Sequence, residues 1–421
     1  MNALFLCLGI PAFLIYMYQC AREKSYLNAL SPYFALYFIV SFIFEPIFFN
    51  SRSDYDYNVP AFIFVYICDF AFFLGLAVAY GALVGRPHSP PPSGRALSDQ
   101  RGLGPLSWVF LTLSFLIFLP VALEFVEFVF TDPRRLYELT RSGYGQYLFV
   151  STLMLNLGVI CFLFSRKKGA VLFVPFVILL SVVKGAKGPI LELAQIFAMW
   201  AVYVRNWRIR LGTFLMMGFA GIVAIIALFA ITLRGLEPEE LFGAITEYSD
   251  YNRHASLTVT DPVGPFYGRL ALENYVYSRL PRVIDKEKPK DFGTFYLARY
   301  YFPDDFFLDA GAPAFGAGVY IADYGPATPL VMLLGGLLCG YLLGACVKWV
   351  RRGGGVAAFI PLLYFANVGL IPIPNGFLII EHWLLGQIVR SLSRIRLQFG
   401  PRARSGIGKS GLRGHELGHS E

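Results

Sequence analysis

The chain alternates long apolar stretches with short polar connections, and one polar stretch is far longer than the others. An apolar run of about 20 residues matches the thickness of a bilayer, so each such run predicts a membrane-spanning helix. We expect eleven spans, at residues 2–20, 32–50, 60–84, 105–130, 145–164, 169–184, 188–204, 212–233, 327–347, 356–371 and 376–393. The long polar stretch, residues 234–326, separates the eighth span from the ninth.

Composition supports a membrane protein. Of the 421 residues 56% are hydrophobic and only 15% are charged, which is more apolar surface than a soluble fold of this length can bury. We therefore expect an all-α polytopic membrane protein of about 11 transmembrane helices, with short helices in one large extracytoplasmic loop. The predicted regions are N-terminal spans (1–233), the loop (234–326), C-terminal spans (327–396) and a disordered basic cytoplasmic tail (397–421).

Lys and Arg in the short connections predict the orientation, because basic residues near span ends stay cytoplasmic. One alternate set of connections, together with the tail, holds 21 of the 36 Lys and Arg, and the opposite short connections hold six. The first apolar stretch has no basic n-region, so we expect it to be retained as a span. The N-terminus is predicted outside, the C-terminus inside, and residues 234–326 outside.

Two functional classes are disfavoured by the same counts. The net charge of +8 lies in the cytoplasmic connections and tail, where topology and anionic lipid account for it, so we do not expect nucleic-acid binding. The six cysteines lie inside or at the ends of predicted spans and provide neither a disulfide framework nor a zinc spacing. We expect no metal and no cofactor.

A polar turn, Val183-Lys-Gly-Ala-Lys-Gly-Pro189, interrupts two apolar runs at the outer face. Helix-end amides and the ammonium groups of Lys184 and Lys187 would converge there, which favours a phosphate-binding turn. A tight hairpin with snorkelling lysines is an equally good interpretation.

The outer segment carries its own candidate site. Arg269, Glu273 and Tyr277 are spaced i, i+4 and i+8 and would share one helical face. Residues 292–301 predict another short helix, and a glycine-rich stretch leads into the ninth span. The segment holds nine basic and fourteen acidic residues, so an anion site there has to be local.

An enzyme outside the cytoplasm has no nucleotide sugars and needs a substrate that is activated inside and then flipped across. A lipid diphosphate glycan meets this requirement. Fixed Arg and Lys groups stabilise the charge that grows on the departing diphosphate, while a carboxylate or His254 could accept the proton of the attacking hydroxyl.

The chain resembles the oligosaccharide repeat-unit polymerases, or Wzy-type O-antigen polymerases. The resemblance is carried by the late outer loop, Gly185-Ala-Lys187, Leu233-Arg-Gly235, and Val319-Tyr-Ile-Ala-Asp-Tyr-Gly325 before a Gly-rich span. The family usually has Gly-Ser-Arg where this chain has Gly185-Ala-Lys187, and lysine lacks the bidentate fork of arginine. An Arg, ten residues, Gly pattern of the family occurs here at Arg134 and at Arg253.

The resemblance implies a metal-independent, inverting glycosyltransferase of GT-C-like fold. It would move a growing glycan from undecaprenyl diphosphate onto a lipid-linked repeat unit at the outer face of the bacterial inner membrane. Diphosphate contacts would come from Lys184, Lys187, Arg234, Arg253, Arg269, Arg279 and Arg282, and the candidate bases are Glu273, His254 and Asp323. Expected partners are the lipid-linked oligosaccharide, membrane lipid, a flippase and a chain-length regulator.

Three alternatives stay open at this point. An O-antigen ligase shares the architecture and the lipid-diphosphate chemistry and differs in its acceptor. A lipid-linked glycan flippase or other transporter would favour internal repeats and charges spread through several spans, which this sequence does not have. A non-catalytic partner in polysaccharide export would tolerate alanine at every outer arginine.

Overall fold

The computed structural model describes residues 4–47, 58–84, 102–129, 131, 133–140, 144–165, 169–185, 187–232, 250–278, 280, 284–308 and 314–394, and every regular element in these ranges is helical. The apolar helices are η1 (Phe5–Gly9), α2 (Ile10–Glu23), α3 (Ser31–Phe34), η2 (Ala35–Phe44), α5 (Val59–Val84), α6 (Leu103–Glu124), α8 (Gly145–Phe164), α9 (Ala170–Val183), α10 (Lys187–Tyr203), α11 (Leu211–Thr232), α18 (Thr328–Arg351), α19 (Gly355–Asn367) and α20 (Gly376–Leu392). The connecting helices are α7 (Pro133–Thr140), α13 (Asp250–Thr260), α14 (Arg269–Tyr277), α15 (Thr294–Tyr301), α16 (Pro303–Leu308), α17 (Gly318–Tyr324) and η5 (Gly325–Ala327).

Each predicted span overlaps one of these apolar helices, so the all-helical fold class is confirmed. The short helix predicted at 292–301 is also present, as α15. The span predicted at 105–130 is too long, because α6 ends at Glu124 and the backbone of Phe125 leaves the helical region at φ −114° and ψ 38°. The span predicted at 327–347 is too short, because α18 continues to Arg351.

Five described helices are long and apolar enough to cross a bilayer: Phe5–Glu23, Val59–Val84, Leu103–Glu124, Gly145–Phe164 and Gly318–Arg351. Of the remaining predicted spans, α11 has 22 residues, and the others are shorter helices, for example 14 residues in α9 and 13 in α19. A helix of that length falls short of the roughly 20 residues that a perpendicular crossing requires. These helices fit a polytopic membrane protein, and the count of eleven spans stays a prediction.

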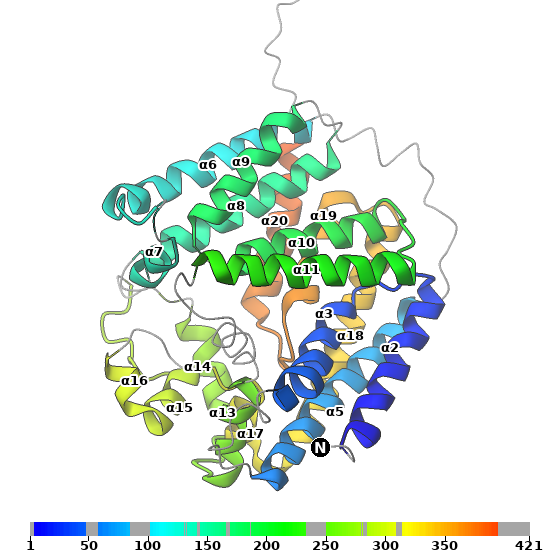
Figure 1. Cartoon of the computed structure of the whole chain (residues 1–421), viewed down its shortest axis with the longest axis vertical. Helices are drawn as coiled ribbons and strands as arrows, with labels where there is room; N and C mark the ends of the chain where they lie inside the picture. Colours follow the sequence, from blue (N-terminus) through cyan, green and yellow to red (C-terminus); the bar gives the residue numbers. More distant parts are fainter. Residues whose placement is uncertain are drawn as a thin grey trace, which may run out of the picture.

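The centre of the lower part of the molecule in Figure 1 is the pair α5 and α18, which run parallel and side by side. A Cβ on Gly336 would overlap the carbonyl oxygen of Phe72, and a Cβ on Gly340 would overlap that of Leu76. The same contact therefore repeats four residues further along both helices. Glycines at this spacing let two membrane helices approach to backbone contact.

A buried polar cluster joins the C-terminal ends of α2, α5, α10 and α18. The carboxylate of Glu23 accepts from Tyr80 Oη at 2.7 Å and from Arg351 Nη2 at 2.7 Å, and Tyr203 Oη lies 3.3 Å from it. These four helices belong to the first, third, seventh and ninth predicted spans, which should all end on the same side. The meeting of these four C-terminal ends supports the predicted alternation of span directions. Which side of the membrane they face stays a prediction.

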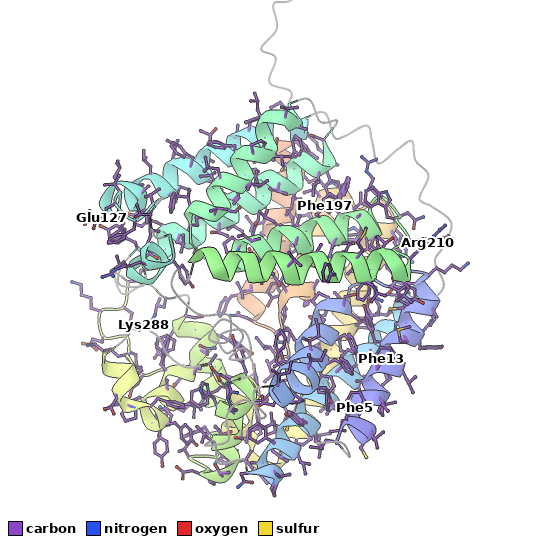
Figure 2. All side chains as sticks on the ribbon, viewed as in Figure 1. Phe5, Phe13, Glu127, Phe197, Arg210 and Lys288 are labelled. Carbon is purple, nitrogen blue, oxygen red and sulfur yellow. The ribbon has the colours of Figure 1, made fainter. Side chains whose placement is uncertain are left out.

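A second group, α6, α8 and α9, forms the upper part of Figure 1. Helices α6 and α8 are antiparallel, and Ser114 and Ser151 exchange hydrogen bonds from Oγ to the other residue's carbonyl at 2.7 and 2.8 Å. Apolar side chains also remain exposed on helices of the rest of the molecule, among them Phe5 of η1, Phe13 of α2 and Phe197 of α10 (Figure 2). Such exposure is expected where lipid is the solvent.

Candidate functional site

The described part of residues 234–326, the segment predicted to lie outside and called the outer segment, packs where α5 and α18 begin. Helix α13 lies against α5 and α17, and α14 also lies against α17, which leads through η5 into α18 (Figure 1). Asn252 of α13 donates from Nδ2 to Ser41 Oγ in η2 at 3.2 Å. The segment therefore contacts the membrane helices through two of its own helices, α13 and α17.

Helix α14 carries the exposed charged pair of the segment. Arg269 Nε lies 2.6 Å from Glu273 Oε1, one helical turn away, with side chains 65% and 20% exposed. The pair is the one that the i, i+4 spacing predicts. The second carboxylate oxygen, Glu273 Oε2, accepts from the amide of Gly293 at 3.1 Å, which orients the carboxylate on the helix. The neighbouring Glu273 raises the pKa of Arg269 above its usual range, so the guanidinium is charged at all ordinary pH.

The first turn of α14 is bound by a residue far away in the chain. Asp323 at the end of α17 is fully buried, and its two carboxylate oxygens accept from the amides of Leu270 at 3.0 Å and Ala271 at 2.9 Å. The chain before α14 runs beside α17 as well, with the amide of Tyr267 donating to the Asp323 carbonyl at 2.7 Å. Gly264 permits this approach, because a Cβ there would overlap the carbonyl oxygen of Ala322.

The middle of α14 is attached to two further elements. Tyr275 donates from Oη to the carbonyl of Ile373, in the connection between α19 and α20, and lies 3.2 Å from Tyr320 Oη of α17. Burial raises the pKa of Tyr275 to about 12, so its hydroxyl remains a donor at neutral pH. Helix α14 is thus held both by α17 and by the connection between α19 and α20.

Arg253 is buried, in contrast to Arg269. It lies on α13, forms an ion pair with Asp250 one turn earlier, and places Nη1 3.8 Å from Glu45 Oε1 at the end of the second predicted span. A buried guanidinium between two carboxylates anchors α13 to the membrane helices. Gly264 is the glycine of the pattern that begins at Arg253. Its role in the structure is to allow close packing against Ala322.

His254 follows on the same helix and is partly buried. Its Nδ1 lies 2.9 Å from the carbonyl oxygen of Ala314, and its ring packs against Phe302 and Phe315 at centroid distances of 4.9 and 5.6 Å. A neutral ring that donates from Nδ1 leaves Nε2 as the basic nitrogen. The contacts hold the ring in one orientation between α13 and the chain before α17.

Lys184 lies within the other helix group. Its ammonium group is fully buried, with Nζ 3.4 Å from Ser114 Oγ and in electrostatic contact with Glu192, which accepts from Asn156 Nδ2 at 2.6 Å. The ammonium group of Lys184 thus lies at the level of the Ser114 and Ser151 contact between α6 and α8. These contacts are with protein groups, as expected of a lysine that is buried in a membrane.

Several expected site residues cannot be compared. Arg234, Arg279 and Arg282 lie outside the described residues, and for Lys187 only the backbone at the start of α10 is described. Another cation of the segment, Lys288, packs its ammonium over the Phe292 ring at 4.7 Å and donates to the Leu280 carbonyl. It was not among the expected site residues.

Tertiary contacts assemble part of the expected set around α14. Arg269, Glu273 and Asp323 meet there, and Arg253 and His254 lie on α13, which packs against α17 as α14 does, whereas Lys184 belongs to the α6 and α8 group. Sequence reasoning missed Tyr275 as a contact between helices, and it missed Glu45 as a partner of Arg253. The isolated Glu45 near the end of an apolar run was the one available signal, because a carboxylate there needs a partner.

Two known proteins are similar to the chain. It is 33% identical over 383 residues to the O-antigen polymerase of Salmonella typhimurium (strain LT2), in an alignment that covers 90% of this chain and 92% of the relative. The O-antigen polymerase of Salmonella typhi matches with the same identity and coverage. No protein-family profile and no solved structure matches the chain. Because the alignment omits only a tenth of the chain, it includes most of the outer segment.

Proposed function

We propose, since this chain belongs to the O-antigen polymerase family, that it polymerises a polysaccharide from lipid-linked repeat units. The donor would be a growing glycan on undecaprenyl diphosphate, and the acceptor would be the next lipid-linked repeat unit. The reaction would take place at the outer face of the bacterial inner membrane, with residues 234–326 outside, the N-terminus outside and the C-terminus cytoplasmic. The name shared by both relatives favours this function over a ligase, a flippase or a non-catalytic partner.

The observation that carries the proposal is the Arg269 and Glu273 pair on α14. It joins an exposed guanidinium to an oriented carboxylate at the place where the outer segment meets the membrane helices. A lipid diphosphate reaching the membrane surface would present its charge at that level. Arginine suits this role because its planar group can contact phosphate oxygens through two hydrogen bonds.

The proposed step is an inverting displacement without a metal. The acceptor hydroxyl oxygen bonds to the anomeric carbon of the donor sugar while the bond from that carbon to the diphosphate oxygen breaks. Its electron pair leaves with the diphosphate, and the hydroxyl proton passes to Glu273. Once protonated, Glu273 holds Arg269 less strongly, so the guanidinium can turn to the diphosphate as the negative charge on it grows.

Other residues receive secondary roles. His254 is the alternative base, since its ring is held in a fixed orientation on α13, which packs against α17 as α14 does. Arg253 keeps α13 in place through Glu45 and Asp250. Further diphosphate contacts are assigned to Lys187, Arg234, Arg279 and Arg282, whereas the enclosed ammonium of Lys184 is left out of this set. A flippase that delivers repeat units and a chain-length regulator are the proposed protein partners.

The test uses alanine at Arg269 in cells that lack their own copy of the protein. We expect Arg269→Ala and Glu273→Gln to abolish the ladder of long-chain polysaccharide, while single repeat units are still attached to the lipid core. Arg299→Ala is a matched control, because Arg299 forms an equally short exposed pair with Asp291, at 2.6 Å, in the same segment. A full ladder from Arg269→Ala, at wild-type protein abundance, contradicts the proposed site.

A further inference from the structure

Helix α14 begins without a capping side chain of its own. The residue at its N-cap position is Gly268, which provides no side-chain acceptor for the amides of the first turn. Those amides have no partner within the helix and need one from elsewhere. Asp323 fulfils this need from 53 residues further along the chain, with one carboxylate oxygen on Leu270 and the other on Ala271.

The chain around Gly268 is shaped to receive this cap. The amide of Phe266 donates to the Ala322 carbonyl at 3.1 Å and that of Tyr267 to the Asp323 carbonyl at 2.7 Å, so residues 266–267 run along the end of α17. Gly268 itself has φ +88°, and a Cβ there would lie 2.6 Å from Tyr324 Oη. The backbone carbonyl and the side chain of Asp323 thus both bind amides within residues 267–271.

The position of Asp323 makes it unsuited to proton transfer. A general base has to come within hydrogen-bond distance of the hydroxyl that it deprotonates. Asp323 is fully buried, and both of its oxygens are occupied by backbone amides of α14. Glu273 on the same helix has a side chain that is 20% exposed.

We propose that Asp323 is a positioning residue: by capping α14 it fixes Arg269 and Glu273 relative to α17 and α18. This inference rests on the proposed function, because it assigns those two residues to the reaction. The position of the pair then depends on where α18 begins, since α17 continues through η5 into that helix. A carboxylate is well suited to such a cap, since negative charge is stabilised at a helix N-terminus.

Substitutions at Asp323 separate a cap from a base. Asparagine keeps one of the two acceptor oxygens of Asp323 and alanine keeps neither, whereas neither residue can act as a base. We expect Asp323→Asn to keep part of the polymer ladder and Asp323→Ala to lose it. If both variants are equally inactive while their α14 amides exchange as slowly as in the wild type, Asp323 acts in the chemistry and the proposal is overturned.

Hydrogen exchange on the purified full-length protein gives a readout that does not depend on activity. We expect Asp323→Ala to speed exchange of the Leu270 and Ala271 amides about tenfold, and Asp323→Asn to speed it less. Asp285→Asn is the control, because Asp285 accepts from the amide of Glu287 in the same segment but not from α14. Unchanged exchange in Asp323→Ala overturns the cap, whatever the result for Arg269→Ala. Faster exchange beside an active Arg269→Ala variant would instead count against the proposed function.

Discussion

Two ion pairs in different parts of the molecule show how the same chemistry is used in two ways. Glu23 and Arg351 meet at 2.7 Å with side chains 1% and 23% exposed, and two tyrosines complete their surroundings. Arg269 and Glu273 meet at 2.6 Å with the arginine 65% exposed. The first pair is enclosed by four helix ends and holds them together. The second belongs to one short helix and leaves its guanidinium accessible to a ligand.

A loss of activity can be assigned to function only where the substitution leaves the fold intact. Breaking a buried pair leaves a charge without compensation and destabilises the whole fold. Breaking an exposed pair changes stability little, so an effect on polymer formation there reflects function.

The largest effect on stability is expected at the buried pair. Arg351→Ala leaves the Glu23 carboxylate in a buried site without its cation, which costs about 3–5 kcal/mol of unfolding free energy. Thermal unfolding of the detergent-purified protein should show a large fall in the midpoint. The neighbouring Arg352 is exposed, and Arg352→Ala should change the unfolding free energy by less than about 0.5 kcal/mol. Equal midpoints for the two variants would contradict the structural role of the cluster.

An intermediate effect is expected at the contact of α5 with α18. Gly340→Ala places a Cβ where the carbonyl oxygen of Leu76 lies, and relieving this overlap should cost about 1–3 kcal/mol. Gly376→Ala provides the comparison, because no atom lies within 4 Å of a Cβ at that position. We expect thermal unfolding to show a lower midpoint for the first variant alone. An unchanged midpoint for Gly340→Ala would mean that the backbones of α5 and α18 are not in contact at this position.

The smallest effect on stability is expected at the pair that matters most for the proposed reaction. A double-mutant cycle of Arg269→Ala and Glu273→Ala should give a coupling of at most about 0.5 kcal/mol, as is usual for exposed pairs one turn apart on a helix. The polymer ladder should nevertheless disappear in each single variant. Coupling well above 1 kcal/mol would place this pair in the structural class and weaken its functional assignment.

Local features of the site were predictable from the sequence. The Arg269 and Glu273 pair depends only on helical spacing, and the structure contains it. The helix α15 likewise follows from its own residues. The contact of Asp323 with α14 was not predictable, because it joins residues about 50 positions apart and no periodic pattern marks it. Asp323 therefore looked like a candidate base, and its contacts favour a positioning role.

Burial separated the remaining cations in a way that residue type cannot reveal. Arg253 and Arg269 are both arginines of the outer segment, yet one is buried beside Glu45 and the other is exposed. Lys184 was expected at an outer turn, and its ammonium lies buried beside Ser114. Whether a cation is available to a substrate depends on its neighbours, and these come from distant parts of the chain.

Hydropathy and helical spacing are enough to predict the helical class, the positions of the apolar helices and the charge pair on α14, because both act over neighbouring residues. Only the folded chain reveals which helix ends meet, which cations are enclosed, and that a carboxylate of α17 caps α14. These features depend on backbone approach and on desolvation between segments that are remote in the chain. Both effects arise only when the helices pack.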